Sequence, residues 1–358
     1  MRNREGGRRL LTLRPLEQAA RLSLLGILGL VLAGASAAAL TFGSASISLE
    51  TVLHVLLHRL PGIGAGFTSG SAAEQLIILS IRLPRVVLAV CVGGALASAG
   101  AVMQGLFHNP MAEPYVMGVS AGAALGATIG FVLRLDMSFL GLGAVPLLAF
   151  LGGLSTTILV VNLGRVGSKV PLTVVLLAGI AVGSFLSAIN SMFMIFNRDD
   201  MHQIVFWIMG GFSGRGWEHV HAALPYMVVG LGVIALHLRE LNLIALGEEK
   251  AQQLGLEAGR VQFILIAAAS LITAAAVSVS GIIGFVGLIV PHVVRLVIGP
   301  DHRFLLPTSC LLGGIFLLAA DTLARTVLSP MELPVGVITA LAGAPFFLYL
   351  LNKTKHGM

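Results

Sequence analysis

Long apolar runs, separated by short charged or prolyl breaks, dominate this chain. Ten of the runs approach the roughly 20 residues that a helix needs to cross the hydrocarbon core of a bilayer. They predict spans at residues 20–42, 83–107, 115–134, 139–162, 171–196, 219–238, 260–279, 282–298, 304–326 and 335–352. The pattern therefore predicts an all-α, polytopic membrane protein with about ten transmembrane helices.

The composition supports this prediction, because a soluble fold cannot bury so much apolar surface. The chain is 56% hydrophobic and 11% charged, whereas about a quarter of the residues of a soluble domain are charged. Its formal net charge of +6 comes from basic residues scattered over loops and termini, which fits the positive-inside rule better than nucleic-acid binding. No nucleic-acid partner is expected, and membrane lipid is.

Counting Lys and Arg on the two sides predicts the orientation. If the N-terminus is inside, fifteen of these residues fall on the inner side and seven on the outer side, so both termini should be cytoplasmic. The cytoplasmic parts are then an N-terminal segment (1–19) and a loop at 239–260. The apolar run 22–42 exceeds the roughly 7–15 residues of a signal-peptide core, so we interpret it as a retained first helix.

Two outer segments, 44–80 and 197–217, are longer than a simple turn. Each holds an apolar stretch, at 51–60 and at 204–209, that predicts a short helix at the outer interface. Between the spans no segment is long enough for a soluble domain of even about 50 residues. The chain is therefore predicted to form a single transmembrane domain, residues 1–358.

Glycines recur at helical spacing in one predicted span and at the start of another. Gly118, Gly122, Gly126 and Gly130 follow one another every fourth residue, and a second series at 281, 284 and 287 follows every third. Such stripes let two helix backbones approach closely in lipid. Both series are expected to be packing faces, and Ser280-Gly281 is expected to be a hinge between two spans.

The motifs of several enzyme classes are absent. The sequence has no G-x-x-x-x-G-K-[ST] loop for nucleotide phosphates and no H-E-x-x-H or paired-cysteine motif for metal,. Cys91 and Cys310 lie within apolar runs and are expected to pack there. No catalytic residue, metal site or cofactor is therefore predicted.

One acidic residue, Asp321, lies clearly inside a predicted span. Arg325 follows four residues later on the same helical face, so the two side chains can pair. An ion-coupled secondary transporter usually carries acidic residues at the bilayer midplane, and this pattern does not favour one. A polytopic membrane enzyme would need polar groups that converge within one leaflet. Both classes are kept as alternatives.

The segment LNLIALGEEKAQQLGL, residues 241–256, has the pattern of a partner-binding site. A short apolar helix, a glycine break, a charged helix and a second Leu-Gly-Leu follow one another on the predicted cytoplasmic side. An amphipathic helix pair with apolar side chains outside the membrane suits the groove of another protein.

Several motifs together carry a family resemblance. They are RLPR and NPMAEP within residues 82–126, ALGEEKAQQLGL, FWIMGGFSG at 206–214, SGIIGFVGLIVPHVVRL at 280–296, and the pair AD and ELPVGV at 320–321 and 332–337. The chain resembles the permease subunits of ABC importers for iron chelates, haem and vitamin B12 over about residues 76–350. The resemblance implies a homodimeric type II ABC importer permease that carries a ferric siderophore, haem or cobalamin across the inner or plasma membrane.

The resemblance also implies partners and roles for individual residues. Two ATPase subunits would bind below, and a periplasmic or lipid-anchored substrate-binding protein would dock above, so this chain itself would not be an enzyme. Residues expected to dock the binding protein are Arg82, Arg85 and Arg325, and those expected to contact the ATPase are Leu246, Gly247, Glu248, Glu249, Gln253, Leu254 and Gly255. The cytoplasmic gate maps to Asn109, Met111, Leu172 and Thr173. Flexible methionines suit a pathway for a bulky ligand, which adds Asn190, Met192 and Met194.

Overall fold

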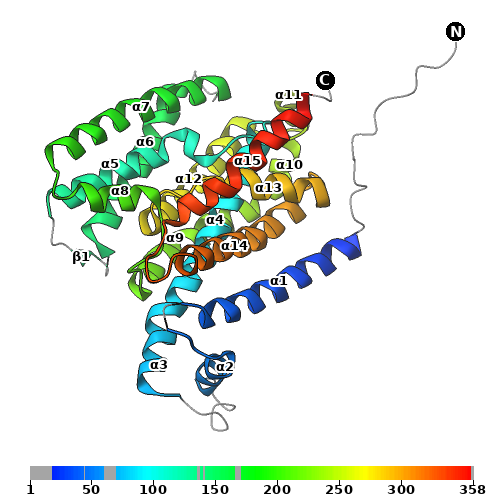
Figure 1. The fold of residues 1–358 in the computed structure, drawn as a ribbon. Helices are drawn as coiled ribbons and strands as arrows, with labels where there is room; N and C mark the ends of the chain where they lie inside the picture. The colour runs from blue at the N-terminus through cyan, green and yellow to red at the C-terminus, as the bar shows by residue number, and fades with distance from the viewer. Residues whose placement is uncertain are drawn as a thin grey trace.

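The computed structural model describes residues 18–43, 45–59, 70–134, 138–139, 142–165 and 171–355. Residues 1–17 of the predicted N-terminal segment lie outside this part of the chain. In chain order the described elements are α1 (Gln18–Thr41), α2 (Leu49–His58), α3 (Ala72–Leu76), η2 (Ile77–Arg82), α4 (Leu83–Leu106), η3 (Pro114–Met117), α5 (Val119–Val132), β1 (Ser138–Phe139), β2 (Leu142–Gly143), α6 (Ala144–Gly164), α7 (Leu172–Phe196), α8 (Met201–Met209), α9 (Trp217–Leu236), α10 (Leu238–Ile244), α11 (Glu248–Gln253), α12 (Ala258–Ser280), α13 (Val286–Ile298), α14 (His302–Thr326) and α15 (Val335–Lys355). The architecture is a bundle of helices (Figure 1).

Each of the ten predicted spans contains a helix, and the all-α prediction is confirmed. Among the described residues, seven helices are long and apolar enough to cross a membrane. The short helices expected near 51–60 and 204–209 are present as α2 and α8. The chain is therefore a multi-pass membrane protein.

Four predicted boundaries are wrong: α5 starts at Val119 and α6 at Ala144, later than 115 and 139, and two others differ for clearer reasons. The predicted span 83–107 is part of a longer continuous helix, Ala72–Leu106, of 35 residues. Its turn Ile77–Arg82 is π-helical and precedes Pro84. Because proline has no N–H to donate to an earlier carbonyl, the turn before it can widen without ending the helix.

The predicted span 282–298 begins too early, because α13 starts at Val286. The chain leaves α12 at Gly281 and enters α13 after Phe285, and both residues have a positive φ, of 69° and 70°. The hinge predicted at Ser280-Gly281 is thus confirmed, but the expected stripe of Gly281, Gly284 and Gly287 is wrong, because the first two glycines are not helical. The 13 residues of α13 span only about 20 Å, less than the hydrocarbon core.

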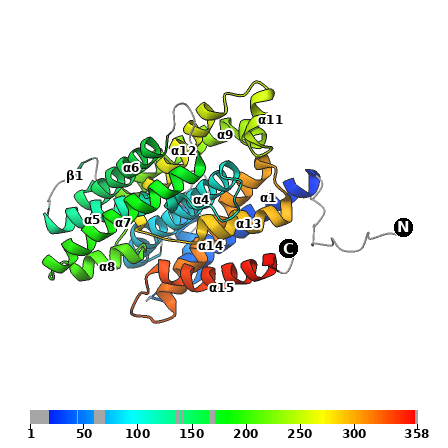
Figure 2. The same cartoon turned by 90° about the horizontal axis from the view of Figure 1, so that it is seen from above.

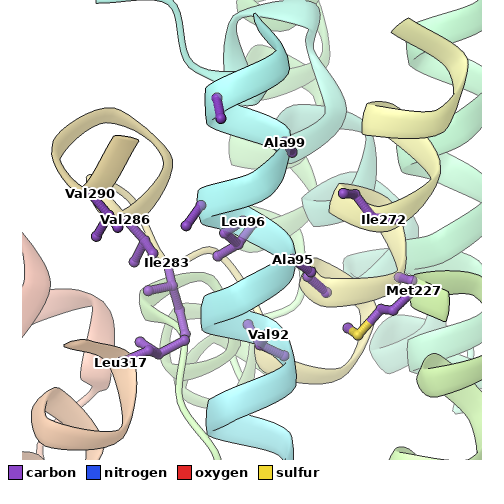
Figure 3. Close-up of a cluster of buried hydrophobic side chains, with 14 of the residues drawn as sticks. Val92, Ala95, Leu96, Ala99, Met227, Ile272, Ile283, Val286, Val290 and Leu317 are labelled. Carbon is purple, nitrogen blue, oxygen red and sulfur yellow. The ribbon is translucent and has the colours of Figure 1, made fainter. Parts of the chain in front are cut away.

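Helix α4 is the centre of the bundle. Val92, Ala95, Leu96 and Ala99 lie along it, with side chains of α9 and α12 on one side and of α13 and α14 on the other (Figure 3). Its glycines permit this crowding: a methyl group on Gly100 would lie 1.9 Å from the Gly287 carbonyl oxygen. The small residues of α4 therefore let several neighbours approach its backbone.

The first glycine stripe is confirmed as a packing face for Gly122, Gly126 and Gly130, whereas Gly118, with a φ of 78°, precedes α5. Gly122 and Gly126 face α6, where an added methyl group would lie 2.3 Å from the Gly152 carbonyl oxygen and 2.1 Å from that of Leu148, respectively. Any larger side chain would separate the two helices. The stripe therefore fixes the α5–α6 contact.

The bundle has two opposite ends, which we name after their short helices. The α11 face carries α10, α11, the first residues of α1 and the last of α15, and the α2 face carries α2, α3 and the end of α1 (Figure 1). Seen from above, α15 runs along one edge, and α9 and α11 lie at the opposite edge (Figure 2). Both ends of the described chain therefore lie on the α11 face.

Candidate functional site

At the α2 face, two arginines bind the end of α1. The guanidinium of Arg82 donates to the carbonyl oxygens of Leu40 at 2.6 Å and of Thr41 at 3.0 Å. Arg325 donates to that of Phe42 at 2.9 Å. The last carbonyls of a helix have no partner within it, and positive charge is favourable there. Arg82 and Arg325 therefore hold α1 against the bundle.

Arg85 forms the centre of an ion-pair cluster on the same face. Its guanidinium contacts the Asp321 carboxylate at 2.8 Å and that of Glu332 at 2.9 Å. The predicted pair of Asp321 with Arg325 is present, but at 3.6 Å. Asp321 is completely buried, so the nearer Arg85 is its main partner. We call these five residues, Arg82, Arg85, Asp321, Arg325 and Glu332, the arginine cluster.

The three arginines that are predicted to dock the binding protein are largely buried in this cluster. Arg82 and Arg325 are 5% and 6% exposed, and all three side chains already have partners within the chain. Glu332 is the most accessible carboxylate of the cluster, with a side chain 36% exposed. Their docking role stays a prediction, and it requires that a partner compete with these bonds.

Burial and the neighbouring Arg85 act in opposite directions on the pKa of Glu332, which lies between α14 and α15. Burial alone would raise the pKa of this carboxyl group, but hydrogen bonds and positive charge from Arg85 outweigh it and lower the pKa below 4.5. The carboxylate therefore stays ionised in the folded protein at neutral pH.

The non-helical segment between α12 and α13 is hydrogen-bonded by two side chains that sequence reasoning did not select. The Tyr115 hydroxyl donates to the Ile283 carbonyl at 2.8 Å, and a Glu113 carboxylate oxygen accepts from Phe285 N–H at 3.0 Å. Non-helical backbone at membrane depth must find partners within the protein. Glu113 and Tyr115 supply them, and their place directly after NPMA was the signal that could have identified them.

On the α11 face, α10 and α11 present the expected pair of short helices. Leu241 and Ile244 of α10 are fully buried, whereas Leu246 and Leu254 are 60% and 66% exposed. Gly247, with φ 115°, breaks the two helices apart. The predicted coupling residues therefore include two exposed apolar side chains beside the acidic start of α11.

The predicted gate residues lie on two separate elements. Asn109 follows α4, and its side-chain oxygen accepts from Met111 N–H at 2.9 Å, which fixes a tight turn. We call residues 108–111 the gate turn. Leu172 is the first residue of α7, and Thr173 is exposed. The gate assignment stays a prediction.

The predicted pathway residues on α7 point in different directions. Asn190 is buried and accepts a hydrogen bond of 2.5 Å from the Thr128 hydroxyl of α5. Its amide group lies 3.8 Å from the Met194 sulfur, and Met192 is 53% exposed. Only 17% of the most apolar 18-residue stretch of α7 is buried, so other helices of the chain leave an apolar face of α7 uncovered. Asn190 contacts α5, and Met192 lies on that exposed face.

A pocket of 330 Å³ lies beside the arginine cluster, lined among others by Arg85, Trp207, Arg215 and Glu332. This volume is at the lower limit of small-molecule sites. Within the described parts of the chain, no three His, Cys, Asp or Glu side chains come together as a metal site.

The geometry defines the class of protein. A membrane bundle with a central glycine-rich helix, a half-length helix behind a non-helical segment, and exposed short helices at one end has the features of a transport permease. The model of the FecCD transport family matches residues 30–353. The chain belongs to this family.

Relatives align along most of their length. The cobalamin import system permease protein BtuC of Halobacterium salinarum is 44% identical over 332 residues, covering 89% of this chain and 88% of that protein. The hemin transport system permease protein HmuU of Yersinia pestis is 41% identical over 297 residues, with coverages of 81% and 87%. A solved structure, described as an inward-facing conformation of a transporter assigned to the metal-chelate ABC type, superposes with a TM-score of 0.80 at 31% identity, covering 93% of this chain and 99% of that one.

Proposed function

We propose that this chain is the membrane permease of an ATP-driven importer for a metal chelate, either a ferric siderophore, haem or cobalamin. A substrate-binding protein delivers the chelate, and two ATPase subunits drive two copies of the chain. Relatives named for cobalamin, hemin and ferric-dicitrate import support this substrate class. The whole chain serves as one transmembrane domain.

The observation that carries the proposal is the exposed α10–α11 pair. Leu246 and Leu254 lie outside any predicted span and are largely exposed, so water or a partner must cover them. Burying one leucine side chain in a partner groove is worth about 1.5–3 kcal/mol. Glu248 and Glu249, with Gln253 and the flanking glycines Gly247 and Gly255, give this surface polar contacts around its apolar centre. This surface is the proposed ATPase site.

The orientation follows from the same assignment. If α11 contacts a cytoplasmic ATPase, both chain termini are cytoplasmic, as the Lys and Arg distribution predicts. The α2 face then faces outward, where Arg82, Arg85 and Arg325 would meet acidic groups of the binding protein. In an inner or plasma membrane this places the gate turn on the cytoplasmic side.

The proposed homodimer rests on the face of α7. Its exposed apolar side chains include Leu177, Phe185 and Phe196, at 63%, 66% and 77% exposure. The pocket beside Trp207 is small for a bulky chelate, so a pathway between two copies is the better route. Asn190, Met192 and Met194 would belong to this pathway, and Asn109, Met111, Leu172 and Thr173 would close its inner end.

The test is reconstitution in proteoliposomes with a purified ATPase subunit and a purified substrate-binding protein. Uptake of radiolabelled cobalamin, haem and a ferric hydroxamate is measured with and without ATP. We expect ATP-dependent uptake of one of these probes, and no ATP hydrolysis by the permease alone. An ATPase variant that binds but does not hydrolyse ATP is the matched control.

The alternatives give different outcomes in the same vesicles. Uptake driven by a proton or sodium gradient without ATP would support a secondary transporter. Chemical conversion of a probe without transport would support a membrane enzyme. Either result, or ATP hydrolysis by the isolated chain, would overturn the proposal.

A further inference from the structure

His108 joins two parts of the proposed importer that are distant in sequence. It follows the end of α4 and begins the gate turn. Its Nε2 atom lies 2.8 Å from the carbonyl oxygen of Ile244, the last residue of α10. A carbonyl oxygen only accepts, so the imidazole must donate. This hydrogen bond connects the gate turn to the proposed ATPase-binding helices.

The backbone at His108 is set for this contact. Its φ is 49°, in the left-handed region that L-residues rarely occupy, although Asn, Asp and His do so more often than others. The turn that follows is closed by the bond from Met111 N–H to Asn109. A change in the position of the His108 side chain therefore acts directly on the backbone of the gate turn.

Helix α10 is firmly attached to the bundle at its other contacts. The Asn242 amide donates to Asp301 at 2.7 Å, and its oxygen accepts from His302 N–H at 2.9 Å, at the start of α14. Leu241 is fully buried beside Gly105 of α4. Helix α10 is therefore joined to the start of α14 and to the end of α4, so a displacement of α10 would reach both, whereas most of α11 is exposed.

We propose that His108 is a positioning residue that transmits the displacement of α10 and α11 to the gate turn. This inference rests on the proposed function, because it assigns the displacement to the ATPase. When the ATPase moves α10, the His108–Ile244 bond carries that movement to Asn109 and Met111. Without the bond, ATP hydrolysis continues, but it opens the gate less often per cycle.

The experiment uses the full complex of permease, ATPase and binding protein in proteoliposomes. His108→Asn keeps a residue that tolerates the left-handed backbone but is too short to reach Ile244. His108→Gln can place an amide N–H near the position of the imidazole Nε2 and is the rescue variant. Uptake per ATP hydrolysed is measured with whichever probe the parent transports: cobalamin, haem or a ferric hydroxamate.

A single hydrogen bond typically changes an equilibrium by about 2- to 10-fold. We therefore expect His108→Asn to lower uptake per ATP by that factor, and His108→Gln to restore most of it. ATPase copurification and the melting temperature should stay at the parent values. The rate at which a maleimide labels Met111→Cys should respond to ATP in the parent background and less so with His108→Asn.

Unchanged uptake per ATP in His108→Asn would overturn the inference while leaving the proposed function intact. A lower melting temperature or lost ATPase binding in both His108 variants would assign the residue a folding role and would also overturn it. If the parent complex shows no ATP-dependent uptake, the proposed function itself fails, and the inference fails with it.

Discussion

The arginine cluster and the α10–α11 pair lie at opposite ends of the molecule. They differ in whether their functional side chains already have partners within the chain. In the cluster, three guanidinium groups and two carboxylates are bonded to one another or to α1. In the pair, Leu246 and Leu254 are exposed beside the acidic start of α11. The charged groups of the cluster therefore have partners within the chain, whereas the α10–α11 pair exposes apolar surface that a partner could cover.

The difference teaches that charge in the sequence does not by itself mark an interaction surface. Removing one partner of a buried ion pair is costly because the other charge is left unpaired. Truncating an exposed apolar side chain costs the isolated fold little and affects binding instead. Substitutions in the cluster should therefore affect stability most, and substitutions in the α10–α11 pair should affect association most.

The largest effect is expected at Asp321. Asp321→Ala leaves Arg85 without its main partner and removes the charge beside Arg325, which should lower the free energy of unfolding by about 3–5 kcal/mol. Thermal melting in detergent measures it, with Asp199→Ala on the surface as the control. The pair Arg85→Met with Asp321→Leu should recover part of the loss. An Asp321→Ala protein that melts with the parent would show that the cluster does not stabilise the fold.

The next effect concerns two leucines of the same helix pair. Leu254→Ser should weaken ATPase association about 10-fold or more, because the buried leucine is worth about 1.5–3 kcal/mol, and should leave melting unchanged. Glu248→Ala should weaken association less. Leu241→Ala is the matched control: this leucine is fully buried, so it should lower stability by about 2–5 kcal/mol. Normal ATPase copurification and transport by Leu254→Ser would contradict the coupling assignment.

Docking at the α2 face should show a smaller effect. Arg85→Glu and Arg325→Glu should reduce the affinity for the binding protein, most strongly at low salt, because attraction becomes repulsion. Both changes also break internal bonds, so affinity is compared only between proteins whose melting shows them to be folded. Charge reversal on the binding protein should restore binding. Unchanged affinity and salt response in both would assign the arginines to the fold alone.

The smallest effect is expected from pH. The lowered pKa of Glu332 means that its ion pair stabilises the fold above the ordinary value of 4.5 and that this contribution is lost as pH falls through the lower folded value,. The parent melting temperature should therefore decline below about pH 4.5, and Glu332→Gln should decline less. The side chain is 36% exposed, so solvent screening keeps the effect small. Identical pH profiles would exclude this contribution.

Several features could be predicted from local pattern. Apolar runs located a helix in all ten spans, and the Gly247 break with its charged neighbours predicted α10 and α11. The α5 glycine stripe predicted close packing, and Gly118 to Gly130 face α6 as expected. These features depend on residues within one or two helical turns of each other, so spacing alone is informative.

The errors share a cause in long-range contacts. Hydropathy gave no reason to start the second helix at Val286 rather than at residue 282, because the non-helical backbone of 281–285 is hydrogen-bonded by Glu113 and Tyr115, which are far away in sequence. The bonds from the cluster arginines to α1 and to Asp321 also join residues far apart in sequence, so spacing did not predict them. The most apolar 18-residue stretches of the long helix that contains α4 and of α7 have similar mean hydropathies, 2.2 and 1.9. Yet 83% of the first stretch and only 17% of the second is buried within the protein.

The sequence by itself determined the membrane class, the order of the main apolar helices, and the family, because hydropathy and short motifs are local properties of the chain. The tertiary structure decided which helix is central, where the α12–α13 segment loses its helical bonds, and which charges remain available. Those outcomes depend on contacts between residues far apart in sequence. At Gly100 a carbonyl oxygen of α13 leaves no room for a methyl group. At Arg82 the guanidinium donates to carbonyl oxygens at the end of α1 that have no partner within their own helix,.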